Sequence, residues 1–252
     1  MIKILAIDTS GQQACAAIVE ERDNQYIVIG ETSLNARTGE KSWTHSEILM
    51  PGIDQLLNLT GINMQELDYI AYTSGPGSFT GLRIGASTAL GLAKGLNRPT
   101  IPVPTLDSLA YNMLGIVSGI VAPMMDARRE QVYSAIYESA GNTLTRVTDY
   151  LALPIEEMLQ HCPAESTYML GDGACAYKEA ILQIYPQAII VPGNNNRQRA
   201  SSVAICAAHK LKEGFTPQEN NENIEILYIR APQAVQDLKN KEHDKRMKRQ
   251  NV

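Results

Sequence analysis

A glycine-rich segment from Gly75 to Gly85 holds the residue types best suited to chemistry in this chain. Gly75, Gly77 and Ser78 follow an apolar run and precede a helical pattern, which predicts a tight turn between a strand and a helix. Such a turn can bind an anion, because glycines let backbone N–H groups approach a ligand and a helix N-terminus favours negative charge. The segment has no lysine, so it is not a P-loop. A tight turn packed against the other half of the chain is the alternative interpretation.

Two acidic residues stand at the ends of two other apolar runs. Asp8 and Ser10 follow residues 4–7, and Asp126 and Arg128 follow a similar run in the second half. We expect these four residues to line one cleft. Nucleotide-hydrolysing proteins with two such loops keep both loops small, so that phosphates can reach backbone N–H groups. Here the arginines of the second loop obstruct that approach, unless they pair with the two aspartates or bind a phosphate from outside.

The remaining reactive residue types form no catalytic pattern. The histidines stand at positions 45, 161, 209 and 243, and no serine has a histidine near it in the sequence. The cysteines stand at positions 15, 162, 175 and 206, with no C-x-x-C pair of the kind that binds zinc. We therefore predict no catalytic residue and no metal ligand.

Strands and helices alternate around these residues. In the first half, the pattern predicts strands at residues 4–7, 14–19, 26–29, 69–73 and 100–103. A helix over residues 49–57 starts near Met50 or is kinked by Pro51, a short helix starts at Asn63, and a long helix runs to Leu96. In the second half, we expect helices at 105–114, after 154 and at 174–184, and strands at 120–125, 131–137, 143–150 and 168–170.

The two halves share this plan, which indicates an internal duplication. Ile7-Asp8 recurs as Met125-Asp126, with a strand returning after the turn in both cases. We predict an α/β protein with two related lobes, residues 1–104 and 105–212, and a C-terminal segment, 213–252.

Two predicted helices carry patterns suited to helix–helix contact. One has a stripe of leucines and isoleucine, and the other is crowded with small residues, including glycines that cost about 1 kcal/mol each relative to alanine. Close approach of another helix, from this chain or a second one, would explain the glycines. We expect a partner chain to bind residues on both helices: Leu49, Ile53, Leu56, Leu57, Leu82, Gly85, Ala86, Ala89 and Ala93.

The composition is that of a folded soluble protein. Of the 252 residues, 44% are hydrophobic and 19% are charged, and the net charge of −5 argues against nucleic-acid binding over the whole surface. Residues 233–252 hold six basic and three acidic side chains. This pattern indicates either a solvated chain end or a segment that contacts phosphates. No signal peptide or membrane-spanning stretch is recognisable, and the widely spaced cysteines suit the cytoplasm.

Four segments carry a family resemblance. ILAIDTS at 4–10, SGPGSFTGLRIG at 74–85, MDARREQVY at 125–133 and YIR at 228–230 resemble, in order and spacing, motifs of the TsaB (YeaZ) family. The likeness covers roughly residues 1–232. One departure is Ile226, where the family often has proline.

The resemblance implies an actin-like ATPase fold (ASKHA, RNase H-like), with mixed sheets flanked by helices, that has lost independent activity. It further implies a role in placing threonylcarbamoyl on the adenosine 3′ of the anticodon (t6A) in tRNAs that read codons beginning with A. The implied partners are the catalytic paralogue TsaD, the ATPase TsaE and, through the complex, tRNA. A homodimer is a further possibility, and no membrane is involved.

The same resemblance bears on cofactors. The catalytic paralogue holds its metal through a His-x-x-x-His pair, and the matching positions here are Thr105 and Leu109, which cannot replace imidazole. We thus expect this chain to bind no cofactor alone, with ATP and a metal on partner subunits. The alternatives are a stand-alone ATPase that uses the Asp8 cleft, a peptidase, or a regulatory homodimer.

Overall fold

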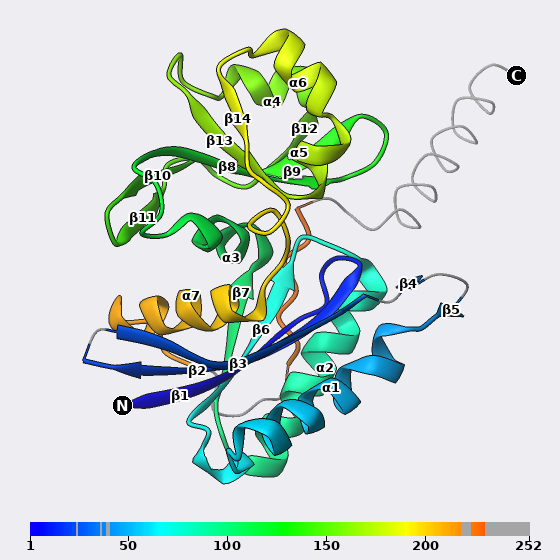
Figure 1. The fold of residues 1–252 in the computed structure, drawn as a ribbon, viewed down its shortest axis with the longest axis vertical. Coiled ribbons are helices and arrows are strands. Elements are labelled where there is room, and N and C mark those ends of the chain that lie inside the picture. The colour runs from blue at the N-terminus through cyan, green and yellow to red at the C-terminus, as the bar shows by residue number, and fades with distance from the viewer. Residues whose placement is uncertain (24, 36, 39–40, 218–222, 230–252) are drawn as a thin grey trace, which may run out of the picture.

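The computed structural model describes residues 1–23, 25–35, 37–38, 41–217 and 223–229. Its two large sheets lie in two lobes, one above the other in Figure 1. The basic residues predicted in the C-terminal tail and Arg230 lie outside the described residues. Within the described ranges, no helix combines the length and apolar character needed to cross a bilayer.

The sheet of the first lobe has the strand order β3-β2-β1-β6-β7. Its central strand β1 pairs antiparallel with β2 and parallel with β6. A short hairpin of β4 and β5 lies outside this sheet. The strands are β1 (Ile2–Asp8), β2 (Gln13–Arg22), β3 (Gln25–Asn35), β4 (Arg37–Thr38), β5 (Lys41–Ser42), β6 (Tyr69–Gly75) and β7 (Thr100–Pro104).

Helices cover both faces of this sheet (Figure 1). Successive side chains of a strand point to opposite faces. On β1, Leu5 and Ile7 pack with helices α1 (His45–Thr60) and α2 (Phe79–Leu96), whereas Ile4 and Ala6 pack with α7 (Ala200–Lys212). Burial on both faces explains why β1 is a continuous apolar run instead of an alternating one.

Helix α1 begins earlier than the apolar pattern predicts. Thr44 is its N-cap residue, and the Thr44 N–H donates a 2.7 Å hydrogen bond to Oε2 of Glu47. Pro51 lies inside the helix, so the predicted start near Met50 is wrong. The capping signal expected at Asn63 is confirmed, although it opens only a 3₁₀ turn, η1 (Met64–Glu66).

The sheet of the second lobe repeats the plan of the first. Its order is β11-β10-β8-β13-β14, and β8 pairs antiparallel with β10 and parallel with β13, as β1 does with β2 and β6. The predicted duplication into two mixed-sheet lobes is thus confirmed. The strands are β8 (Gly119–Asp126), β9 (Gln131–Ser134), β10 (Tyr137–Ala140), β11 (Thr143–Arg146), β12 (Leu151–Pro154), β13 (Thr167–Leu170) and β14 (Ala188–Ile190).

The second lobe also departs from the predicted elements. The single strand expected over 131–137 is two strands, because β9 pairs with β12 whereas β10 pairs with β11. Ile136 sits between them, and its carbonyl accepts a 2.8 Å hydrogen bond from Val147 N–H. Two helices predicted as long are broken into shorter ones. The remaining helices are α3 (Thr105–Ala110), η2 (Tyr111–Met113), α4 (Ile155–Gln160), α5 (Asp172–Ala176) and α6 (Lys178–Ile184).

The end of the described chain returns to the first lobe. Helix α7 falls in the range predicted for the second lobe but packs on the first sheet (Figure 1). Residues 223–229 then run past the end of β6, where Leu227 N–H donates a 2.7 Å hydrogen bond to Ser74 O. Ile229 packs against the core cluster of the second lobe. These late segments therefore connect the two lobes.

Candidate functional site

The end of β1 forms a buried polar cluster. Oδ1 of Asp8 accepts hydrogen bonds from the Ser10 N–H (2.8 Å), the Ser10 hydroxyl (2.6 Å) and the Thr73 hydroxyl (3.2 Å). Its Oδ2 has no hydrogen-bond partner among the residues that the structure describes. Burial raises the pKa of the Asp8 carboxyl above its ordinary value. The structure therefore joins Asp8 to Ser10 and encloses the carboxylate, whereas the sequence led us to expect it in an open cleft.

The glycine-rich turn packs directly against this cluster. Ser78 N–H donates a 2.7 Å hydrogen bond to Ser10 O, and Ser78 Oγ caps α2 by accepting from Gly81 N–H at 3.2 Å. A Cβ atom on Gly77 would overlap with Ser10, and one on Gly75 would overlap with the Leu227 carbonyl. These contacts match the packed-turn interpretation, although its neighbours are the Ser10 loop and the C-terminal segment.

The loop after β8 is held by acidic side chains. Oδ1 of Asp126 accepts hydrogen bonds from the Arg128 N–H (2.7 Å) and the Tyr177 hydroxyl (3.1 Å). The Asp126 N–H donates to Oδ1 of Asp172 at 3.1 Å, and burial raises the pKa of the Asp172 carboxyl. Within the described ranges, no hydrogen bond or ion pair joins Asp8 to this loop. Of the two alternatives for Arg128 and Arg129, pairing of their side chains with these aspartates is therefore not found among the described residues.

The two positions that the family resemblance matches to metal ligands, Thr105 and Leu109, lie in the interior. Thr105 is the first residue of helix α3 and Leu109 lies near its end, and both are almost fully buried. In the part of the chain that the structure describes, no three His, Cys, Asp or Glu side chains gather where they could hold a metal ion.

The side chains predicted to bind a partner belong to the chain's own core. All nine are buried: Leu49, Ile53, Leu56, Leu57, Leu82, Gly85, Ala86, Ala89 and Ala93. Their periodic stripes face the first sheet, since the apolar face of an amphipathic helix covers the nearest apolar surface. The assignment of these side chains to an interface is therefore wrong. The close neighbour of Gly85 is likewise not a helix but Thr9, after β1.

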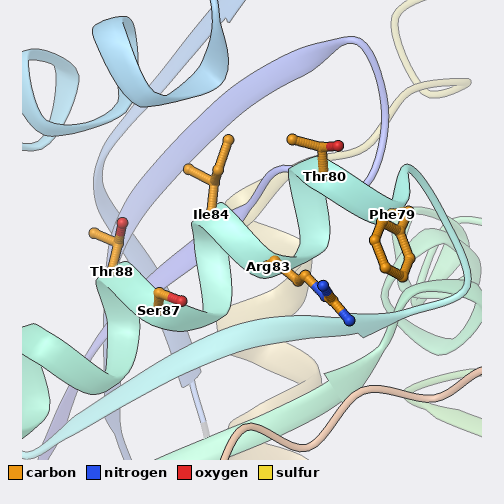
Figure 2. Close-up of a pocket in the computed structure, with 6 residues that line it drawn as sticks. All are labelled: Phe79, Thr80, Arg83, Ile84, Ser87 and Thr88. Carbon is orange, nitrogen blue, oxygen red and sulfur yellow. The ribbon is translucent and has the colours of Figure 1, made fainter.

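The opposite face of α2 is exposed and hollowed. It holds a pocket of about 480 Å³, lined by Phe79, Thr80, Arg83, Ile84, Ser87 and Thr88 (Figure 2). The Arg83 guanidinium lies 3.9 Å from the centroid of the exposed Phe79 ring. The Phe79 and Tyr228 ring centroids are 6.0 Å apart. This face was not predicted from the sequence, where its signal is a phenylalanine in the first turn of a helix with an arginine four residues later.

The sequence is similar to proteins of threonylcarbamoyladenosine biosynthesis. The family described as "TsaD: tRNA N6-adenosine threonylcarbamoyltransferase" matches residues 39–234. A protein of Bacillus subtilis, "tRNA threonylcarbamoyladenosine biosynthesis protein TsaB", is 37% identical over 210 residues, 82% of this chain and 87% of its own length. The Escherichia coli protein of that name is 29% identical over 252 residues, 96% of this chain and 100% of its own length.

A solved structure shows the same fold. YeaZ from Pseudomonas aeruginosa superposes with a TM-score of 0.73 and 24% sequence identity, covering 91% of this chain and 100% of its own. The predicted two-lobe α/β fold, with mixed sheets flanked by helices, is thus confirmed. The sequence match and the shared two-lobe architecture lead to one conclusion: the chain belongs to the TsaB (YeaZ) family of tRNA threonylcarbamoyladenosine biosynthesis proteins.

Proposed function

We propose that this chain is a non-catalytic subunit for threonylcarbamoylation of the adenosine 3′ of the tRNA anticodon. It acts in the cytoplasm by binding the catalytic paralogue TsaD and helping to recruit the ATPase TsaE. It binds no cofactor by itself, and its partners hold the ATP and the metal. The family's role in threonylcarbamoyladenosine biosynthesis supports the assignment to this reaction. The residues described below support a non-catalytic role beside catalytic partners.

Two features favour a non-catalytic role. Buried Thr105 and Leu109 occupy the positions that correspond to the paralogue's metal-binding histidines. The Ser78 N–H, which an anion at the glycine-rich turn would need, already donates to Ser10 O. A nucleotide phosphate would have to displace that internal hydrogen bond, and the nearby Asp8 carboxylate is closed to solvent.

The proposed contact with the transferase rests on the exposed face of α2. Its pocket presents the apolar Phe79 and Ile84 beside Arg83 and small polar side chains (Figure 2). On the neighbouring helix α1, Met50 and Leu59 are also exposed. The transferase family matches this chain across both helices, so a transferase partner would present an equivalent pair. Two helix pairs can then pack into a four-helix contact.

Co-purification with the transferase tests the proposal. Ser87→Arg adds a long charged side chain at an exposed pocket position, so the monomer should stay folded while close packing is blocked. Gln183→Arg makes the same addition at an exposed position of α6 in the other lobe and is the matched control. We expect the wild type and Gln183→Arg to co-elute with the transferase and Ser87→Arg to elute alone.

Each failure would be informative. Elution of the wild type apart from the transferase would overturn the proposed function. Normal pairing of Ser87→Arg would keep the function and exclude this face as the contact. A wild-type chain that forms only homodimers through this face would favour the regulatory homodimer instead.

A further inference from the structure

The loop between β8 and β9 holds three consecutive residues in the left-handed backbone region. The φ angles of Arg128, Arg129 and Glu130 are 61°, 53° and 60°. Side chains with a Cβ atom are disfavoured there, and glycine adopts this conformation without the steric cost. A connection needed only to reverse the chain would be served better by glycine. The strained positions instead carry two arginines and a glutamate, which indicates that the side chains themselves are needed.

Hydrogen bonds on both sides of Arg129 hold this backbone conformation. Asp126 accepts a hydrogen bond from the Arg128 N–H at 2.7 Å, and the Arg128 carbonyl accepts from Gln131 N–H at 3.1 Å. The Glu130 carbonyl accepts from Ile155 N–H, also at 3.1 Å. The backbone of the arginines is thus held by hydrogen bonds to the second lobe. The points from which their side chains extend are therefore set before any ligand binds.

Both guanidinium groups are available to a ligand. Arg128 and Arg129 are exposed and, within the described ranges, their side chains make no hydrogen bond, ion pair or ring contact. The Asp126 carboxylate, two residues away, accepts from the Arg128 backbone and the Tyr177 hydroxyl instead of from a guanidinium. Other arginines of this acidic chain are engaged: Arg22 with Glu20, Arg83 with Phe79, Arg146 with Tyr150 and Arg199 with Glu31.

We propose that Arg128 and Arg129 bind phosphates of the tRNA backbone in the assembled complex. This inference rests on the proposed function. A guanidinium group matches the geometry of a phosphate and can donate two parallel hydrogen bonds to it. A net charge of −5 gives the chain no general attraction for RNA, so any contact depends on local, uncompensated cations. The two arginines supply such a pair at a fixed position.

Glycine substitutions separate this role from a structural one. In Arg128→Gly/Arg129→Gly the strain is removed together with the charges, so the melting temperature should stay the same or rise. The affinity of the assembled complex for an unmodified tRNA transcript should fall about tenfold or more. The slope of log affinity against log salt should decrease by about one to two, because each lost phosphate contact removes close to one unit.

Two controls and a prior check accompany the measurement. Arg197→Ala removes another exposed arginine that has no side-chain partner in the described structure, and it should leave affinity and salt slope unchanged. Arg128→Lys/Arg129→Lys retains both charges and should keep most of the salt slope while losing affinity. Gel filtration shows first whether each variant assembles with the transferase.

The outcomes distinguish the two proposals. If the wild type does not assemble with the transferase, the proposed function is wrong, and so is this inference, which rests on it. If the glycine variant assembles and binds the transcript as tightly as the wild type, with the same salt slope, only the phosphate contact is overturned. If that variant instead loses the transferase, the loop contacts an acidic protein surface, and the assignment to RNA is wrong.

Discussion

Thr9 and Gly85 meet where the chain leaves β1 and passes under helix α2. The Thr9 hydroxyl donates a 2.7 Å hydrogen bond to the carbonyl of Gly81, one turn before Gly85. A Cβ atom on Gly85 would overlap with Oγ1 of Thr9. The glycine therefore allows the helix to approach the loop that holds the buried Asp8 cluster.

Gly85→Ala should accordingly destabilise the fold. The added methyl group must displace Thr9 and its hydrogen bond, and overpacking of this kind costs about 1–3 kcal/mol. Gly91→Ala is the matched control, since a Cβ atom there meets nothing within 4 Å. That change should stabilise the helix by about 0.5–1 kcal/mol. Urea unfolding of the two variants measures both effects, and equal stabilities would contradict the packing argument.

Ala89→Arg should unfold the chain instead of acting only on partner binding. Ala89 is 0% exposed and packs between α2 and the first sheet. An unpaired charge buried there costs several kcal/mol, a large part of the total stability of an ordinary domain. Circular dichroism should show loss of cooperative melting for this variant and retention for the exposed Ser87→Arg. A folded Ala89→Arg monomer would mean that this face of α2 is not core.

Asp8→Asn should stabilise the chain at neutral pH. Burial raises the folded-state pKa of Asp8 above its unfolded value, so the ionised carboxyl lowers stability once the pH exceeds both values. Asparagine keeps an oxygen for the Ser10 and Thr73 donors without the buried charge. The advantage of the variant should shrink as the pH falls through the carboxyl range, because the wild-type group then becomes neutral. A pH series of urea unfolding midpoints checks this sign.

Tyr137→Phe should destabilise the chain, because it removes a hydrogen-bond donor from a second buried carboxylate, Asp107. The Tyr137 hydroxyl donates a 2.5 Å hydrogen bond to Oδ1 of Asp107, to which Tyr150 also donates. Loss of one donor should cost about 1–3 kcal/mol. Burial raises the Asp107 pKa and the Tyr137 hydrogen bond lowers it, so the pKa should rise further in the variant. The cost should be largest above the folded-state pKa and smaller when Asp107 is protonated. Tyr133→Phe, whose hydroxyl has no hydrogen bond in the described structure, should be nearly neutral.

Local patterns determined most of the elements and their duplication. The apolar period of α1, the glycine-rich turn before α2, the Asn63 capping signal and the matching ends of β1 and β8 were all readable, because they depend on neighbours within a few residues. The two-lobe plan followed from those repeats.

Only the tertiary structure decided what covers each apolar face. The stripe of α1 and the small residues of α2 indicated a contact, but hydrophobic burial is non-directional, so the pattern could not tell a partner chain from the first sheet. For the same reason, nothing in α7 showed that it returns to the first lobe. The left-handed backbone of Arg128 and Arg129 was equally hidden, since hydrogen bonds from Asp126 and from residues outside the loop impose it against the local preference of both residues.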